Sequence, residues 1–255
     1  MSTCTVVVPC FNEAARLDVN AFADFVHRTD VQFLFVDDGS RDHTLGVLKE
    51  LEAVCPARIH VHALASNVGK AEAVRRGLLE ACRSRPSYVA FWDADLATPL
   101  DDIVPFTQLL EARPDIEMVF GSRVNLLGRE VHRALLRHYV GRVFATAAAA
   151  VLGIGIYDTQ CGAKMFRVSD RFVAQLQEPF IGGWIFDVEM IAREIRSRRG
   201  TNLPPTATII YEFPLTVWRD VAGSKIKLRD WFVVGGNLGR IYFKYMWPGR
   251  ARANG

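Results

Sequence analysis

The sequence predicts an α/β fold in which a mostly parallel sheet is flanked by helices. Short runs rich in β-branched and aromatic residues alternate with helical patterns through the first half of the chain. The strand-like runs are apolar throughout, as in strands that are covered on both faces. A polar cluster follows each of these runs, at the edge where parallel sheets bind ligands.

The expected elements follow one another in a regular order. We expect strands at residues 3–8, 32–36, 58–64, 88–92 and 117–120. We expect helices at residues 14–28, 44–54, 70–83 and 101–112. Because a helix separates each strand from the next, the connections are crossovers, and crossovers join parallel strands.

The composition of the chain excludes several classes of protein. Its 255 residues, 50% of them hydrophobic, are enough to bury a sizeable core. A net charge of +3 with 23% charged residues gives no reason to expect a nucleic-acid partner. The five cysteines are scattered without a C-x-x-C pair, which indicates reduced thiols in a cytoplasmic protein rather than a zinc site or disulfides. No signal peptide is evident in MSTCTVVVPCFNE at the N-terminus.

The second half of the chain has features of a membrane-associated surface. Residues 143–156 are apolar and uncharged, but the run is shorter than the roughly 20 residues of a transmembrane helix, so we expect a buried or membrane-grazing helix. Arg129, Arg133 and Arg137 recur at every fourth position, which predicts a basic stripe on one helical face. Residues 225–255 mix basic side chains with large aromatic ones, a combination typical of a helix on an anionic membrane surface. Packing of these aromatics in the core is the alternative.

Five polar clusters are expected to converge at one edge of the sheet, at residues 9–13, 37–40, 66–70, 93–95 and 121–123. The first of them contains no G-x-G-x-x-G pattern of a dinucleotide enzyme, and the chain has no Walker lysine loop. The turn after the first expected strand is therefore not a glycine-rich phosphate-binding loop. Asn12 and Glu13, with Asp37 and Asp38 after the next strand, offer hydrogen-bonding groups suited to a base and a ribose.

The fourth expected strand ends in two carboxylates, Asp93 and Asp95, in the stretch FWDADLATPLDD. Residues at alternate positions of an extended chain point to the same side, so the two charges repel unless a cation lies between them. Mg²⁺ and Mn²⁺ favour carboxylate oxygens, and such ions also bind the phosphates of nucleotides. A single D-x-D is weak evidence, but its position after D-D-G-S in an alternating α/β half makes it strong evidence for a metal site.

The motifs taken together resemble those of the family-2 glycosyltransferases. Within that family they are most similar to the dolichyl-phosphate glucose synthases, with the dolichyl-phosphate mannose synthases as near relatives. The matching stretches are VPCFNE (8–13), VDDGS (36–40), NVGKAEAVRRG (67–77), DADLATP (93–99), GSR (121–123), DTQCGAK (158–164), WIFDVEM (184–190) and GSK (223–225). The resemblance implies a Rossmann-like GT-A domain over residues 1–225 and a C-terminal amphipathic, membrane-associating helical segment over residues 226–255.

The resemblance also implies roles for individual residues. The donor nucleotide would be bound by Pro9, Asn12, Glu13, Asp38, Lys70, Asp93, Ala94 and Asp95. The metal ion, Mg²⁺ or Mn²⁺, would be held by Asp93 and Asp95. The residues implied in catalysis are Asp93, Asp95, Asp187, Asp158 and Arg123. The acceptor phosphate would be bound by Arg123, Arg219 and Lys225.

The implied reaction is the inverting transfer of a hexose, glucose from UDP-glucose, to a polyprenyl or dolichyl phosphate at the cytosolic membrane face. A phosphate monoester is mostly dianionic at neutral pH, because its second pKa is about 6, so it needs cationic positioning more than a general base. We therefore expect Asp187 and Asp158 to orient sugar hydroxyls or basic side chains, with a base role left open.

Two departures from the family pattern bear on these expectations. The chain lacks the N-terminal membrane helix often found in the glucose branch, which implies peripheral binding or a membrane-protein partner. Ala97 replaces a polar residue often found in the mannose branch, which disfavours GDP-mannose as the donor. The alternatives are a mannose synthase that uses GDP-mannose and a family-2 enzyme with a non-lipid acceptor.

Overall fold

The computed structural model describes residues 3–124, 126–132, 135–219 and 230–247, and it describes side chains throughout these ranges except at 131–132, 135–140 and 230–232. The strands are β1 (Cys4–Cys10), β2 (Gln32–Asp37), β3 (Ile59–Ala63), β4 (Tyr88–Trp92), β5 (Met118–Ser122), β6 (Glu130–His132), β7 (Ala163–Arg167), β8 (Ile210–Pro214) and β9 (Val217–Arg219). The α-helices are α1 (Val19–Arg28), α2 (Thr44–Val54), α3 (Lys70–Cys82), α4 (Ile103–Ala112), α5 (Leu135–Leu152), α6 (Asp170–Gln175), α7 (Phe186–Arg198), α8 (Thr206–Ile209) and α9 (Asp230–Ile241). Short 3₁₀ turns cover Leu100–Asp102 and Gly183–Ile185, and a π-helical turn covers Tyr242–Met246.

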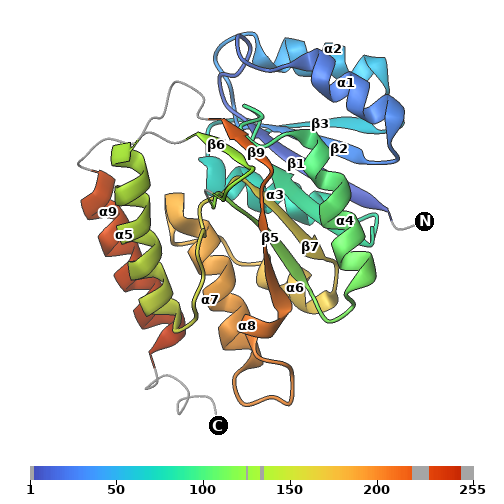
Figure 1. The fold of residues 1–255 in the computed structure, drawn as a ribbon. Helices are drawn as coiled ribbons and strands as arrows, with labels where there is room; N and C mark the ends of the chain where they lie inside the picture. Colours follow the sequence, from blue (N-terminus) through green and yellow to red (C-terminus); the bar gives the residue numbers. More distant parts are fainter. Residues whose placement is uncertain (1–2, 125, 133–134, 220–229, 248–255) are drawn as a thin grey trace.

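A seven-stranded sheet in the order β3-β2-β1-β4-β7-β5-β8 forms the centre of the molecule (Figure 1). Its strands are parallel except β7, which runs antiparallel to both β4 and β5. The last residue of β4, Trp92, therefore pairs with the first residue of β7, Ala163. As a consequence, the loop that enters β7 lies at the edge where the parallel strands end. β6 and β9 form a separate parallel pair.

The sheet separates two hydrophobic cores. Val7 of β1 points to the core shared with α3, α5, α6, α7 and α9, and its neighbours Val6 and Val8 point to the core shared with α1, α2 and α4. Strands buried on both faces lack alternation, which is why their sequences are apolar throughout. Gly77 lets α3 approach β1 closely, because a Cβ there would lie 2.4 Å from Val7 Cγ1.

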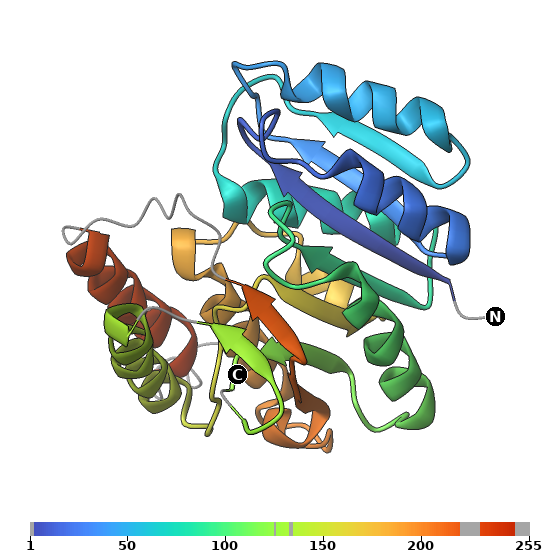
Figure 2. The same ribbon diagram turned by 45° about the horizontal axis from the view of Figure 1, so that its top comes forward.

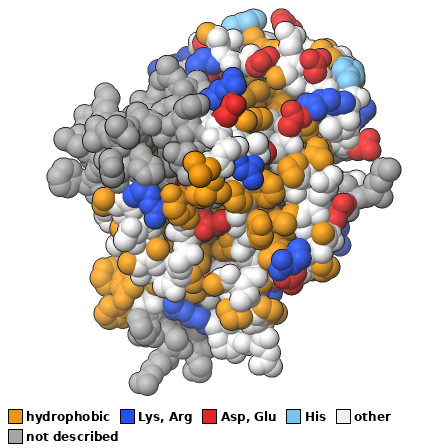
Figure 3. All heavy atoms as spheres, viewed as in Figure 1, with side chains coloured by type: hydrophobic (Ala, Val, Ile, Leu, Met, Phe, Trp, Pro, Cys, Tyr) orange, Lys and Arg blue, Asp and Glu red, His pale blue; other side chains and the backbone are white. Residues whose placement is uncertain are grey.

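Helices α5 and α9 lie side by side outside the layers of the sheet (Figures 1 and 2). Each buries one face, with Phe144 and Ala148 of α5 and Leu238 of α9 inside, while Val143 and Val233 are exposed. Figure 3 shows hydrophobic side chains at the surface over the lower ends of these two helices. Among the helices in the described part of the chain, none is both long and apolar enough to cross a membrane.

The structure confirms the predicted fold class and the order of the first elements, with two corrections. α1 begins at Val19 rather than at residue 14, because Asp18 caps it by accepting a hydrogen bond of 3.0 Å from the N–H of Ala21. Arg129 lies before β6, not on a helix, because the following residues pair with β9, and its guanidinium donates to Thr216 Oγ1 at 2.6 Å. The other two members of the expected stripe, Arg133 and the side chain of Arg137, lie outside the described residues.

Candidate active site

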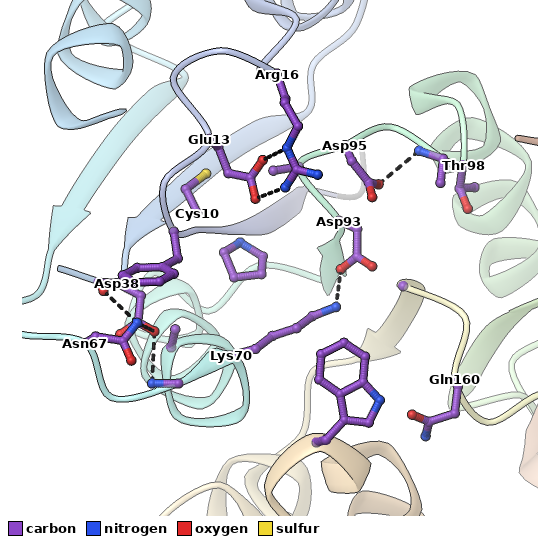
Figure 4. A pocket seen from close by; sticks show the side chains of 18 of the residues that line it. Cys10, Glu13, Arg16, Asp38, Asn67, Lys70, Asp93, Asp95, Thr98 and Gln160 are labelled. Atoms are coloured by element: carbon purple, nitrogen blue, oxygen red, sulfur yellow. Dashed lines mark hydrogen bonds and ion pairs between the residues drawn. The ribbon is translucent and has the colours of Figure 1, made fainter. Parts of the chain in front are cut away.

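The carboxyl ends of β1, β2 and β4 meet at a pocket of about 430 Å³ (Figure 4). Pro9 near the end of β1, Glu13 from the turn after it, Asp38 from the turn after β2, and Ala94 from the turn after β4 line its wall. Turns far apart in the sequence are brought together because parallel strands all end at the same edge of the sheet. The pocket is therefore where the sequence places the donor nucleotide.

The carboxylate of Asp38 organises the loop that follows β3. It accepts hydrogen bonds from the backbone N–H groups of Val68 at 2.7 Å and Gly69 at 2.9 Å. Burial raises the pKa of Asp38, and the two N–H groups oppose that rise. The neighbouring Gly39 has φ +63°, and a Cβ there would lie 2.5 Å from the carbonyl carbon of Ser66, so only glycine fits. Asp38 thus lines the pocket and also shapes it.

Asn12 holds one turn against another instead of lining the pocket with its side chain. Its Oδ1 accepts a hydrogen bond of 2.8 Å from the N–H of Arg41, and its own N–H donates to Ser40 Oγ at 3.0 Å. Its φ of +54° is a conformation that asparagine tolerates better than most residues. The sequence predicted a direct contact with the nucleotide, and the structure gives Asn12 a supporting contact.

Asp93 and Asp95 lie next to each other at the end of β4 (Figure 4). Lys70 Nζ, at the first turn of α3, contacts Asp93 Oδ1 at 2.5 Å. Burial raises the pKa of Asp95, and the charge of Asp93 adds to the rise. Burial would lower the pKa of Lys70, but the charge and hydrogen bond of Asp93, together with the charges of Asp187 and Asp95, outweigh that effect and the net shift is upward. The two carboxylates therefore favour a cation between them, and in this structure the ammonium group of Lys70 pairs with Asp93.

The donor atoms here suit a hard divalent cation. In the described part of the chain, no group of three or more His, Cys, Asp or Glu side chains converges on one point. Mg²⁺ is commonly held by one or two carboxylates together with substrate phosphates, and Asp93 and Asp95 supply such a pair. The site therefore fits an ion that is completed by the phosphates of a bound nucleotide.

A second pocket of about 230 Å³ adjoins the first. The two pockets share Lys70, Asp93, Arg123, Gln160, Gly162 and Trp184 in their walls. Beyond this junction the second pocket has an apolar part from β4, α5, the 3₁₀ turn, α7 and α9, formed by Phe91, Gly141, Phe144, Ala145, Ile185, Phe186 and Val234. Its other lining residues include Arg142, Asp158, Thr159 and Asp187. A polar junction thus connects the first cavity with one that combines an apolar wall with charged groups.

Arg123 stands at that junction and is fixed by Asp158. Its Nε and Nη2 donate to the two carboxylate oxygens of Asp158 at 2.6 and 2.8 Å. Burial would lower the pKa of Arg123, but the charge of Asp158 raises it, and the net shift is upward. Asp158 is itself held by Glu212 of β8, which accepts hydrogen bonds from the N–H groups of Tyr157 and Asp158 at 2.8–2.9 Å. The guanidinium is therefore a fixed positive charge that faces both pockets.

Asp187 lines the second pocket and pairs with Lys164. The distance from Lys164 Nζ to Asp187 Oδ1 is 2.6 Å, and Lys164 also donates to the carbonyl oxygen of Cys161 at 2.5 Å. Burial raises the pKa of Asp187, although the Lys164 ammonium opposes the rise. Since Lys164 is fully buried, its charge depends on this partner.

Of the other two residues predicted to bind the acceptor phosphate, the structure describes only Arg219, and Arg219 lines neither pocket. Arg219, at the end of β9, has an exposed side chain, and its N–H donates to the carbonyl oxygen of Ala97 at 3.1 Å. Ala97 lines the first pocket, so the backbone of Arg219 supports that wall. Lys225 lies outside the described residues.

Sequence reasoning missed several residues that line the pockets. Arg16 is held by Glu13 through two hydrogen bonds of 2.6 and 2.9 Å and lines the first pocket. The spacing of three residues from Glu13 was the available signal. Trp184 from the 3₁₀ turn before α7 and Trp218 from β9 line the first pocket, and Arg123 Cζ lies 5.3 Å from the centre of the Trp218 ring.

Comparison with known proteins shows the family. The model of glycosyl transferase family 2 matches residues 5–171. The chain is 31% identical to dolichyl-phosphate beta-glucosyltransferase of Saccharomyces cerevisiae over 88% of this chain and 69% of the relative. It is 29% identical to the human enzyme of the same name, over 95% of this chain and 75% of the relative. It is 26% identical to polyprenol monophosphomannose synthase of Mycolicibacterium smegmatis, over 90% of this chain and 87% of the relative.

Solved structures show the same fold. Glucosyl-3-phosphoglycerate synthase from Mycobacterium tuberculosis, in complex with Mn²⁺, UDP and glucosyl-3-phosphoglycerate, matches with a TM-score of 0.66 at 19% identity. The match covers 96% of this chain and 80% of that one. The nucleotide-sized pocket at the strand ends, the paired carboxylates, this GT-A fold and the match of the family model lead to one conclusion: the protein is a glycosyltransferase that belongs to glycosyl transferase family 2.

Proposed function

We propose that this glycosyltransferase moves glucose from UDP-glucose to a polyprenyl phosphate, with inversion at the anomeric carbon. One observation carries the proposal, namely the junction at which the polar pocket and the apolar pocket share Lys70, Asp93 and Arg123. A nucleotide sugar suits the first pocket, and an acceptor that is a phosphate joined to a hydrocarbon chain suits the second. The names of the relatives support the same donor sugar and acceptor class.

The donor side of the proposal rests on the first pocket. The turns after β1 and β2 would contact the nucleoside, and Asp93 and Asp95 would hold a Mg²⁺ or Mn²⁺ ion against the diphosphate. That ion, when bound, neutralises the leaving group. The structural neighbours bind Mn²⁺ or Mg²⁺ together with UDP, which supports this assignment. Lys70 can reach the same diphosphate, since its ammonium already lies at Asp93.

The acceptor side rests on the second pocket. An oxygen of the lipid phosphate forms a bond to C1 of the glucose, the bond from C1 to the diphosphate oxygen breaks, and UDP leaves with the electron pair. Arg123 is held rigidly enough to orient the incoming phosphate, because a guanidinium binds phosphate oxygens in a fixed geometry. Arg142 lines the same pocket, and its Nη1 donates to the carbonyl oxygen of Tyr157 at 3.1 Å.

Asp187 has a structural role in this scheme. Its carboxylate is engaged with Lys164, and the phosphate acceptor is already ionised at neutral pH, so a general base is not required. We assign Asp187 and Asp158 to holding basic side chains and sugar hydroxyls. We further propose that the enzyme works at the cytosolic face of a membrane as a peripheral protein, because its acceptor lies in a bilayer. The C-terminal segment from residue 226 onward would supply the contact.

A donor panel tests the proposal. The enzyme is incubated with Mn²⁺ or Mg²⁺, a short polyprenyl phosphate and each of UDP-glucose, GDP-mannose, UDP-N-acetylglucosamine and UDP-glucuronic acid, while nucleotide release and glycolipid are measured. We expect UDP release from UDP-glucose only when the lipid phosphate is present. GDP release with a mannolipid product would favour the polyprenol mannose synthases instead, one of which is also similar to this chain. Nucleotide release without any glycolipid, for every donor, would overturn the lipid acceptor.

A further inference from the structure

A third cavity, of about 590 Å³, lies on the C-terminal helices and has no part in the site described above. It is an open groove lined by Ile181 and by residues of α9 and the π-helical turn, which are Gly236, Gly239, Arg240, Phe243 and Lys244. Its described lining shares no residue with the two pockets of the active site. A Cβ at Gly236 or Gly239 would meet no atom within 4 Å, so the floor of the groove is bare helix backbone.

The groove combines two cations with an apolar wall. Arg240 is exposed, and its guanidinium donates to Asn237 Oδ1 at 3.4 Å. Lys244 Nζ lies 3.5 Å from Glu178, whose side chain is 75% exposed, and a pair so open to solvent contributes little. Phe243 is 60% exposed and packs against Trp247, with ring centroids 5.6 Å apart. Exposed aromatic rings beside basic residues are typical of the headgroup region of a membrane.

We propose that this groove binds an anionic phospholipid, with its phosphate between Arg240 and Lys244 and an acyl chain along the glycine floor and Phe243. Charge complementarity favours an anionic lipid over a neutral one, because basic residues near an anionic membrane surface are attracted to it. The proposal builds on the membrane association described above and assigns it to defined residues. It does not depend on which sugar or acceptor the enzyme uses.

The groove is connected to the active site by a chain of hydrogen bonds. Ile181, in the groove wall, and Gly182 donate their N–H groups to Glu189 Oε2 at 2.7 and 2.6 Å. Tyr245, in the π-helical turn, donates its hydroxyl to Glu189 Oε1 at 2.8 Å. Glu189 is fully buried and its charge is paired with Arg193 at 2.7 Å, so the loop and the π-helical turn are both hydrogen-bonded to one buried ion pair.

The same loop reaches the junction of the two pockets. Asn237 of α9 donates to the carbonyl oxygen of Gly182 at 3.0 Å, and Trp184, two residues further on, lines both pockets. Lys70 Nζ lies 5.7 Å from the centre of the Trp184 ring. A lipid that fixes α9 and Ile181 therefore fixes the loop that carries Trp184. Tyr245 and Asn237 are positioning residues in this arrangement, and the bound lipid is distinct from the acceptor.

Binding is tested by sedimentation with vesicles of phosphatidylcholine alone and of phosphatidylcholine with phosphatidylglycerol. We expect binding to depend on phosphatidylglycerol and to fall at least about tenfold in the Arg240→Glu/Lys244→Glu variant. The matched control is Lys49→Glu/Arg83→Glu, which reverses two exposed charges on α2 and after α3. Equal loss in both variants, or equal binding to both kinds of vesicle, would overturn the site.

The connection is tested by hydrogen–deuterium exchange of the peptide that covers residues 179–185. We expect phosphatidylglycerol vesicles to slow its exchange in the wild-type protein. Tyr245→Phe should still bind vesicles but should exchange this peptide faster, whereas Tyr242→Phe, which removes a neighbouring hydroxyl, should behave like the wild type. Identical exchange in Tyr245→Phe and wild type would overturn the connection. Neither measurement requires a glycolipid product, so both stay informative if the donor panel gives another reaction.

Discussion

Asp93 is confined on two sides. Lys70 Nζ lies 2.5 Å from its Oδ1, and a Cβ built on Gly162 would lie 1.9 Å from its Oδ2. The backbone also closes around it, because the N–H of Asp93 donates to the carbonyl oxygen of Gly162 at 2.9 Å. The carboxylate can therefore hold only a narrow range of orientations, and the glycine of DTQCGAK is part of what sets them.

Replacing Gly162 by alanine should displace the Asp93 carboxylate. We expect kcat to fall by roughly 10²-fold, since a misplacement of about 1 Å at a reacting centre has that effect. Steady-state kinetics with a titration of Mn²⁺ measures the change. Gly155→Ala is the control, because a Cβ there would meet no atom within 4 Å. Unchanged kinetics in Gly162→Ala would mean that Asp93 moves freely.

Asp93 and Asp187 should respond differently to loss of charge. Asp93→Ala should abolish turnover, because it removes a carboxylate that faces the diphosphate. Asp187→Asn should reduce kcat less, since its partner Lys164 is structural, but it should destabilise the fold by about 3–5 kcal/mol because it leaves a buried ammonium unpaired. Kinetics and urea unfolding of both variants separate the two effects. Equal loss of activity in well-folded variants would point to Asp187 as a general base.

Asp102 should make stability depend on pH. Burial raises its pKa to about 6, the charge of Asp101 adds to the rise and Arg129 opposes it. Its Oδ2 is buried and accepts no hydrogen bond within the described part of the chain. As pH rises from about 4 to 6, the unfolded chain loses this proton first, so the folded state loses up to about 3 kcal/mol.

The Asp102→Asn variant should remove that dependence. Urea unfolding at pH 4 and at pH 7 measures the effect. The free energy of unfolding of the variant minus that of wild type should be more positive at pH 7 than at pH 4, because only the wild type loses stability as the pH rises. Asp30→Asn is the control, because the Asp30 side chain is 87% exposed and does not contribute to the raised pKa of Asp102. A pH profile of Asp102→Asn parallel to that of wild type would contradict the assignment.

At the scale of elements, β8 holds the loop that enters β7. Glu212 of β8 accepts both N–H groups of residues 157 and 158 and so places Asp158 against Arg123. Glu212→Ala should loosen that loop and raise KM for the acceptor by about tenfold, while KM for the donor changes little. Glu212→Gln keeps one acceptor oxygen and should recover part of the loss. An equal rise in both KM values would mean that the loop serves the donor pocket too.

The elements also show why some structure was unpredictable. Strands such as β2 and β4 were recognisable, because burial on both faces leaves an uninterrupted apolar pattern. β6 was not, since its three residues are a strand only by pairing with β9, which lies far along the chain. The reversed direction of β7 was equally hidden, because a strand's sequence does not encode whether its neighbours are parallel. Arg129 was assigned to a helix because nothing in the sequence indicated β6, which begins at the next residue.

At the scale of the whole molecule, ligands should stabilise the folded protein. A ligand that binds only the native state at 100 times its Kd adds about 2.7 kcal/mol, which corresponds to a rise in Tm of roughly 5–10 °C for a chain of this size. We expect UDP with Mn²⁺ to produce a rise of this order in a thermal scan, and UDP with EDTA to produce less. Asp93→Ala should lose the part that depends on the metal. An equal rise with Mn²⁺ and with EDTA would contradict a metal site at Asp93.

The candidate site could be located from the sequence, but its internal contacts could not. The clusters at Pro9, Asp38, Lys70 and Asp93 were found because they follow recognisable strands, and all of them line one pocket. The pairing of Lys164 with Asp187 gave no sequence signal, because the two residues come from different elements that meet only in the folded chain.

The reversed direction of β7 separates the two substrates along the chain. The wall of the first pocket comes mostly from the first hundred residues, whereas the second pocket is built mostly from residues beyond 120, together with Lys70, Phe91 and Asp93. Substitutions in the later stretch can therefore change what receives the sugar and leave the donor turns intact. A chimera in which residues 141–158 come from a relative keeps Gln160 and Gly162 of the first pocket, so we expect it to change acceptor preference and to leave donor preference intact.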